Sequence, residues 1–345
     1  MANRRFLAAG AASAGMLALI LDSKTAFYGG VQGVELCIKT VIPSLFPFLF
    51  LSGMFAASFS GSPGFLLRFF GKGFRLPSSV SFVLVPALLG GYPIGAQCLC
   101  QAWRSGLIQK RQAERLLSYC SNVGPAFIFG ILSLKFQRKG TVFAIWAIQI
   151  LSIWTASRFF GAADTQKHSN LSQKAEASPV PGMDSAIQAI LKICGWVILF
   201  RVVIEFLDKW ILHAAAPHWR VVAMGLLELS NGCCCLNLIP QEALRFVICN
   251  VLLAFGGLCV AYQTGSVCPG LRLGYYYAGK ALQAGTAGVL AWGIIHGFYA
   301  ILALWLSVTL FLPNYLQKRV EIKRGLRYNG IHQNGGMRYA VSQKD

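Results

Sequence analysis

The sequence predicts an all-α, polytopic integral membrane protein built from two pseudo-repeats that contain re-entrant or broken helices. Three observations carry this prediction. The chain of 345 residues is 55% hydrophobic and only 12% charged, with a mean hydropathy of +0.56, whereas soluble domains carry about 25% charged residues. Apolar runs of membrane-spanning length recur along the chain. Two of these runs are interrupted near their middle by residues that cannot continue a helix.

Polar or basic loops separate the apolar runs, most of which reach the roughly 17–25 residues that a membrane helix needs. We therefore expect a multi-pass protein of the cell membrane with the lipid bilayer as a partner. The runs cover residues 6–21, 41–59, 80–102, 116–134, 141–160, 186–207, 221–240, 243–264 and 289–312.

The two ends of the chain are basic. Arg4 and Arg5 precede the first apolar run, a pattern typical of a first membrane helix that starts in the cytoplasm. A cleaved export signal fits the same pattern, but a polytopic chain does not need one. We expect a transmembrane helix at residues 1–22 and a basic cytoplasmic tail at residues 313–345.

The first broken run, residues 80–102, lies in a first predicted repeat at residues 23–160 and contains Gly90-Gly91-Tyr92-Pro93. Basic residues flank it on both sides, and basic flanks stay in the cytoplasm. A run with both ends on one face of the membrane must turn back at its middle. We expect a re-entrant hairpin that turns at Gly90–Pro93, because glycine and proline bend the backbone most easily there.

The second half repeats the layout of the first. In the first half, a second interruption follows the hairpin at residues 120–127. Residues 161–184 are polar and hold a Ser-Pro-Val-Pro-Gly cluster, which predicts a linker. Beyond it, residues 185–312 are interrupted at 225–232 and again at 254–258. This order predicts an internal duplication, and the sparse charge of the second repeat predicts the opposite orientation.

Four segments, taken in order, resemble the sporulation integral membrane protein (YlbJ-like) family. They are Gly-Tyr-Pro-Ile-Gly-Ala at 91–96, Ser-Asn-Val-Gly-Pro-Ala-Phe at 121–127, Leu-Leu-Glu-Leu-Ser-Asn-Gly at 226–232 and Phe-Gly-Gly-Leu at 255–258. The resemblance implies nucleoside-recognition or Gate domains, which also occur in concentrative nucleoside transporters and ferrous-iron transporters. It further implies a role in endospore formation in a Gram-positive bacterium, with dipicolinate or a similar small anion as cargo. The cysteine triplet at 233–235 departs from the family pattern.

The breaks predict where a solute binds. Glu228 and Asn231 lie three residues apart in an apolar run, where one helical turn would align them, and ionisable residues at membrane depth suggest function. The structural alternative is that Asn231 and Gly232 end a helix. Gln97 and Asn122 lie near helix starts that favour anions, with interhelical hydrogen bonding as the alternative. The predicted substrate-binding residues are Gly91, Tyr92, Pro93, Gly95, Gln97, Asn122, Gly124, Glu228, Asn231, Gly232, Gly256 and Gly257.

These features favour a transporter or channel for a small polar, anionic solute, either dipicolinate-like or nucleoside-like. Without an ATPase motif, such transport would need a gradient or passive flow, and Glu228 is the natural candidate for proton coupling. The alternative is a membrane scaffold that recruits sporulation membrane proteins and conducts nothing. A homo-oligomer is compatible with both hypotheses.

Other functional classes find little support in the sequence. The net charge of +19 lies in loops between apolar runs, which favours membrane topology over nucleic-acid binding. No nucleophile elbow, phosphate-binding loop or HExxH motif is present, so we expect no enzyme activity and no cofactor. Three adjacent cysteines cannot all face one metal ion. The eleven cysteines therefore predict packing rather than a metal site.

Overall fold

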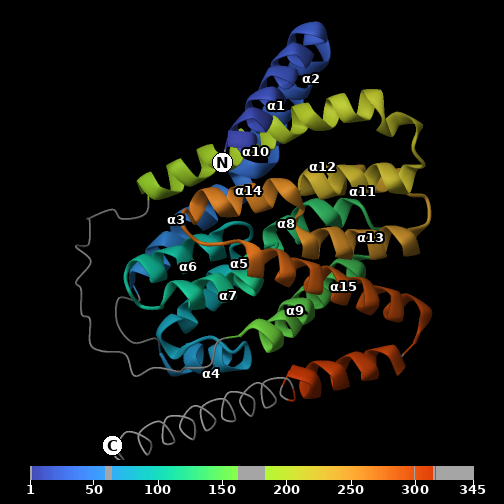
Figure 1. Ribbon diagram of the computed structural model, residues 1–345. Coiled ribbons are helices and arrows are strands. Elements are labelled where there is room, and N and C mark those ends of the chain that lie inside the picture. Colours follow the sequence, from blue (N-terminus) through green and yellow to red (C-terminus); the bar gives the residue numbers. More distant parts are fainter. Residues whose placement is uncertain (1, 59–63, 162–182, 299, 314, 316–345) are drawn as a thin grey trace, which may run out of the picture. The chain divides into compact units, whose positions relative to one another are not determined.

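The computed structural model describes residues 2–58, 64–161, 183–298, 300–313 and 315. Every regular element in these ranges is a helix (Figure 1), which confirms the all-α fold class. Two compact units cover Met1–Ile295 and His296–Asp345, and the second includes the apolar helix Ala300–Pro313. Nearly all of the predicted linker and tail lies outside the described residues.

Among the described residues, four helical stretches are long and apolar enough to cross a membrane. They are Ser23–Leu51, Lys110–Leu134, Gly140–Phe160 and Glu242–Val267. The second and fourth stretches each contain one of the predicted interruptions, so a broken helix still has the length of a full span. The prediction of a multi-pass membrane protein is confirmed.

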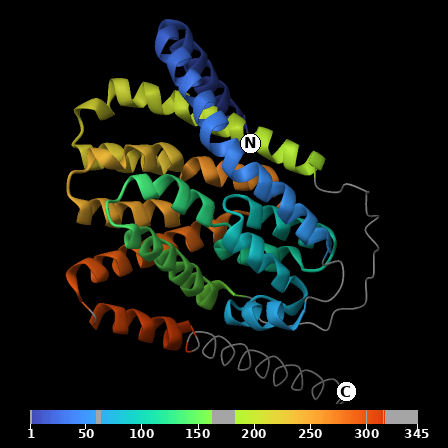
Figure 2. The same cartoon turned by 180° about the vertical axis from the view of Figure 1, so that it is seen from behind.

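The N-terminal helices pack on the long helix that opens the second half. Gly29 and Gly33 permit this contact, because an added Cβ would lie 2.9 Å from the Cα of Val202 and 2.8 Å from the Cα of Ile198. Figures 1 and 2 view the molecule from opposite sides, and both show α2 crossing α10. These elements are α1 (Ala2–Leu21), α2 (Ser23–Leu36), the π-helical turn η1 (Cys37–Val41), α3 (Ile42–Ser58) and α10 (Met183–Trp210).

The first broken run folds as a helical hairpin that turns at Gly90–Pro93, as predicted. Gly91 has a φ of +82°, a conformation that side chains with a Cβ rarely adopt. The two arms touch at Gly95, where an added Cβ would lie 2.8 Å from the Cα of Ala87. The elements up to the end of the hairpin are α4 (Phe65–Gly73), η2 (Ser78–Val83), α5 (Leu84–Leu89) and α6 (Ile94–Arg104).

The order of elements after this hairpin recurs in the second half. A hairpin is followed by a helix interrupted at its middle and then by an uninterrupted helix. The internal duplication itself stays a prediction. In the first half the elements are α7 (Lys110–Cys120), α8 (Pro125–Ile131), η3 (Leu132–Leu134) and α9 (Lys139–Phe160). In the second half they are η4 (Leu212–Ala214), α11 (Pro217–Leu227), α12 (Leu229–Cys234), η5 (Cys235–Leu238), α13 (Glu242–Phe255), α14 (Gly257–Val267) and α15 (Gly274–His296).

The helix break in the second hairpin lies at Glu228 and not at Asn231 and Gly232, where the structural alternative placed a helix end. Glu228 is the only residue between α11 and α12, with extended backbone angles of φ −143° and ψ 117°. Gly232 lies inside α12, so the structural alternative, in which Asn231 and Gly232 end a helix, is wrong. Glutamate supplies its own hydrogen-bond acceptors at the break, and no glycine is needed there.

The two halves exchange hydrogen bonds through their uninterrupted helices. Gln149 of α9 donates from Nε2 to the backbone oxygen of Asn250 in α13, at 3.2 Å. Gln283 of α15 donates from Nε2 to the backbone oxygen of Ser118 in α7, at 2.7 Å. The uninterrupted helix of each half is thus bonded to the broken helix of the other half, and this arrangement brings the breaks of both halves together.

Candidate functional site

Three of the four breaks line one cavity of about 50 Å³. Gly91 and Tyr92 come from the first hairpin, Gly124 from the α7–α8 interruption, and Glu228 from the second hairpin. Gln263 of α14 completes the polar part of the wall. Because one water needs at least about 10–15 Å³, the cavity has room for only a few water molecules.

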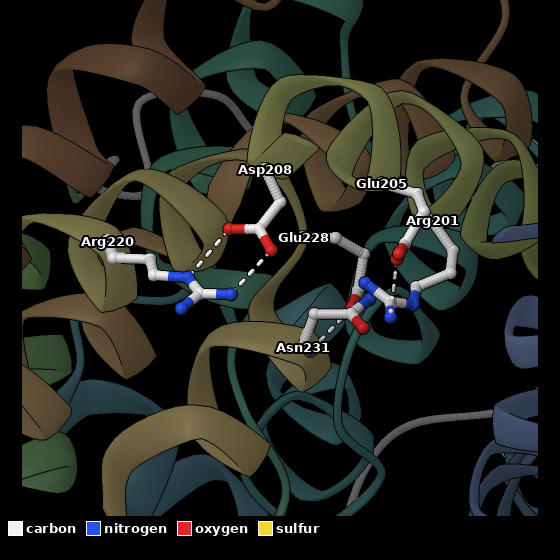
Figure 3. A network of polar contacts seen from close by, with 6 residues as sticks. All are labelled: Arg201, Glu205, Asp208, Arg220, Glu228 and Asn231. Carbon is white, nitrogen blue, oxygen red and sulfur yellow. Dashed lines mark hydrogen bonds and ion pairs between the residues drawn. The ribbon is translucent and has the colours of Figure 1, made fainter. Parts of the chain in front are cut away.

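Glu228 is 2% exposed and caps α12 with its own carboxylate. Its Oε1 accepts from the backbone nitrogen of Ser230 at 3.1 Å. Its Oε2 accepts from the backbone nitrogen of Asn231 at 2.8 Å and from Nδ2 of the same residue at 2.7 Å (Figure 3). These three donors hold the carboxylate in the cavity wall.

The arginines drawn with Glu228 in Figure 3 have carboxylate partners of their own. Arg201 pairs with Glu205 four residues later in α10, at 2.9 Å, as the spacing indicates. Arg220 of α11 donates to both carboxylate oxygens of Asp208. Within the described ranges, Glu228 forms no ion pair. Hydrogen-bond donors hold its carboxyl oxygens instead.

Lys280 of α15 lies behind the wall that Tyr92 forms, and it is 1% exposed. Its Nζ is 3.0 Å from the hydroxyl oxygen of Tyr92, 3.1 Å from Oδ1 of Asn122 and 3.3 Å from Oε1 of Gln283. The Tyr92 hydroxyl in turn donates to the backbone oxygen of Leu253, at 3.0 Å. One lysine therefore connects the first two breaks with the end of α13, close to the fourth break.

The twelve predicted residues take three kinds of position. Gly91, Tyr92, Gly124 and Glu228 line the cavity. Asn122 and Asn231 bond to Lys280 and Glu228, while Gly256 borders the Tyr92 hydroxyl, which would lie 2.9 Å from an added Cβ. The remaining positions do not line the cavity: Pro93 precedes α6, Gln97 is half-buried on α6, and Gly95, Gly232 and Gly257 allow helices to approach closely.

The close-approach glycines explain part of the sequence pattern without a ligand. An added Cβ at Gly232 would lie 2.3 Å from the Cα of Gly225, and one at Gly257 would lie 2.8 Å from the Gly225 backbone oxygen. At Gly95 the distance to the backbone oxygen of Cys120 would be 1.8 Å. The Gly232 contact joins the two arms of the second hairpin, whereas the contacts at Gly257 and Gly95 join a hairpin arm to a broken helix. The three glycines therefore allow close packing around the cavity without lining it.

Sequence reasoning missed Lys280 and Gln283. Lys280 precedes the predicted apolar run, which begins at residue 289, whereas α15 already begins at Gly274. Glycine, glutamine and tyrosine dilute the hydropathy of its first turns. The available signal was one lysine, at position 280, between a tyrosine triplet and an apolar run, because a lysine at membrane depth suggests function by default.

No cluster of three or more histidine, cysteine, aspartate or glutamate side chains that could hold a metal ion occurs among the described residues. Within the triplet, Cys233 is buried and Cys234 is exposed, so the adjacent thiols face different surroundings.

Comparison with known proteins relates the chain to a membrane protein of sporulation. It is 25% identical over 317 residues to the sporulation integral membrane protein YlbJ of Bacillus subtilis (strain 168), a match that covers 79% of this chain and 78% of that protein. No protein-family model and no solved structure matches the chain. The similarity supports the resemblance inferred from the four segments.

Proposed function

We propose that this membrane protein acts in spore formation as a transporter or channel for a small anionic solute, with dipicolinate as the first candidate. The observation that carries the proposal is the convergence of three helix breaks on one cavity with a buried carboxylate in its wall. Broken helices near the middle of a membrane are typical of transporter binding sites. The similarity to a sporulation membrane protein supports the biological setting.

Two helices of eleven residues each, α6 and α14, begin at the breaks. The N-terminus of a helix carries partial positive charge and favours anions. The cavity of about 50 Å³ is smaller than the roughly 300–1,000 Å³ of sites that hold small molecules. The proposal therefore requires the breaks to separate during transport, and the described conformation is a closed one.

Purified protein in proteoliposomes tests the proposal directly. We expect uptake of labelled dipicolinate above that of protein-free vesicles, and spores of a deletion strain should contain less dipicolinate than wild-type spores. Normal spore contents together with no uptake by the purified protein would refute transport.

A membrane scaffold for other sporulation proteins is the second candidate. It is favoured by the complete internal pairing of Asn122 and Glu228, because sealed polar groups are what a non-conducting protein needs. Under this hypothesis deletion impairs sporulation, whereas the purified protein conducts nothing.

A further inference from the structure

The hydrogen bonds around Lys280 determine its charge. The proton of the Tyr92 hydroxyl is committed to Leu253, so toward Lys280 this oxygen can only accept. The amide nitrogens of Asn122 and Gln283 donate to backbone oxygens at 2.6 and 2.7 Å, which orients both amide oxygens toward Nζ. Three acceptors within 3.3 Å match the three N–H donors that only the ammonium form of lysine has. The geometry around Nζ therefore favours a buried cation.

This cation has no anionic partner in the part of the chain that the structure describes. The ion pairs of the described residues lie elsewhere, at Lys39–Glu35, Arg201–Glu205, Lys209–Asp22 and Arg220–Asp208. Neutral oxygens and two aromatic rings surround Nζ, with the ring centroids of Tyr92 and Tyr276 at 4.8 and 5.9 Å. Oxygen dipoles and ring faces stabilise a cation, but a full negative charge would do so more strongly at this depth. Lys280 is therefore available to form an ion pair with an anion.

Tyr92 connects Lys280 with the cavity. It is one of the residues that line the cavity, and its hydroxyl oxygen accepts the hydrogen bond from Nζ. Glu228 lies in the same cavity wall. The cavity thus has a carboxylate on one side and, behind one tyrosine, an ammonium. An anionic group inside it is repelled from Glu228 and attracted toward Tyr92 and Lys280.

We propose that Lys280 is the specificity-determining residue that receives a carboxylate of the solute, once Tyr92 releases it. The proposal rests on the proposed function and deepens it by assigning the residue and the chemical class of the ligand, a small carboxylate. A carboxylate oxygen takes the place of the Tyr92 hydroxyl oxygen at Nζ, and Tyr92 keeps its bond to Leu253 or swings aside. Charge-assisted hydrogen bonds are stronger than the neutral one that is displaced.

The experiment compares dipicolinate with pyridine-2,6-dicarboxamide, which has nearly the same shape and no charge. Equilibrium binding to the detergent-solubilised full chain is measured by calorimetry, and uptake is measured in proteoliposomes. We expect Lys280→Gln to weaken dipicolinate binding by about tenfold or more and to leave diamide binding within about twofold. Lys135→Gln is the control for the same substitution elsewhere, because that lysine donates to the backbone oxygen of Cys234 and does not line the cavity.

Tyr92→Phe tests the same proposal with the lysine in place. It keeps the ring that lines the cavity and removes the acceptor that competes for Nζ. We expect several-fold tighter binding of dipicolinate and unchanged binding of the diamide, whereas loss of a purely structural contact would weaken both. This variant decides the matter if Lys280→Gln does not fold.

The proposal is overturned if wild-type protein binds neither probe, if folded Lys280→Gln keeps wild-type affinity for dipicolinate, or if Tyr92→Phe fails to tighten it. Uptake that is independent of Lys280 would refute this assignment and leave the proposed transport standing. Binding that depends on Lys280 without any uptake would support the assignment and refute transport.

Discussion

The two hairpins differ in how the polar group at the turn is hydrogen-bonded. The first turns through Gly90–Pro93, and its polar group, the Tyr92 hydroxyl, is held by Lys280 and Leu253 from the other half of the chain. The second turns at Glu228 alone, and among the described residues that side chain bonds only to Ser230 and Asn231, two and three residues later. One break is stabilised locally and the other over a long distance. The sequence reveals both breaks, but it reveals the hydrogen-bond partners of the locally stabilised one only.

Removing the local acceptor should have the largest effect on stability. Glu228→Ala leaves two backbone donors and the Asn231 amide without their acceptor, and we expect a loss of about 3 kcal/mol or more in the free energy of unfolding. Thermal unfolding in detergent measures this loss. Glu205→Ala is the control, because its partly exposed pair with Arg201 should contribute about 1 kcal/mol or less. Equal losses would contradict the local capping role.

The turn of the first hairpin should be the next most sensitive. Gly91→Leu forces a branched side chain onto a φ of +82° and places its Cβ 3.2 Å from the backbone nitrogen of Gly124. We expect a cost of about 1–3 kcal/mol, with uptake abolished and membrane insertion intact. Gly15→Leu should be silent, because no heavy atom lies within 4 Å of an added Cβ there. Similar tolerance at both positions would argue against a site-forming turn.

Glu228→Gln keeps most of the hydrogen bonds that cap α12 and removes the ability of residue 228 to release a proton. Glutamine has one acceptor oxygen, so it can retain the bonds from Asn231 and lose the one from Ser230, at a cost of about 1 kcal/mol. Because glutamine cannot release a proton, we expect slow uptake that no longer varies with pH. Uptake by wild type and variant is measured from pH 5 to 8 in proteoliposomes. If both proteins show the same uptake rate and the same pH profile, Glu228 serves only as a structural cap.

The topology of the first hairpin can be tested with almost no effect on stability. Gly73 and Ser105 flank it and are exposed, and the hairpin predicts that both lie on the cytoplasmic side. Cysteines introduced at these two positions, in a background without reactive native cysteines, should react with an impermeant reagent from the same side. Labelling from opposite sides would exclude a re-entrant hairpin.

The sequence revealed interactions between residues that lie close together in the chain, and it did not reveal those between distant residues. Glycine and proline at 90–93 and a glutamate in an apolar run are local signals, and the structure breaks its helices at both places. The Arg201–Glu205 pair followed from its spacing. The contact of Lys280 with Tyr92 spans 188 residues, and no local pattern in the chain encodes it. The close approach of Gly232 to Gly225 also depends on how two helices pack, and the sequence offered only a binding residue or a helix end for this glycine.

The long-range contact also sets an order of events during synthesis. Tyr92 leaves the ribosome 188 residues before Lys280, which corresponds to roughly 10–40 s at usual elongation rates. Throughout that interval the first hairpin is in the translocon or the bilayer without the ammonium that later holds its tyrosine. Its final geometry is therefore fixed only after α15 has been inserted, and the nascent first half is the stage at which a membrane insertase or quality-control protease meets an incompletely bonded turn.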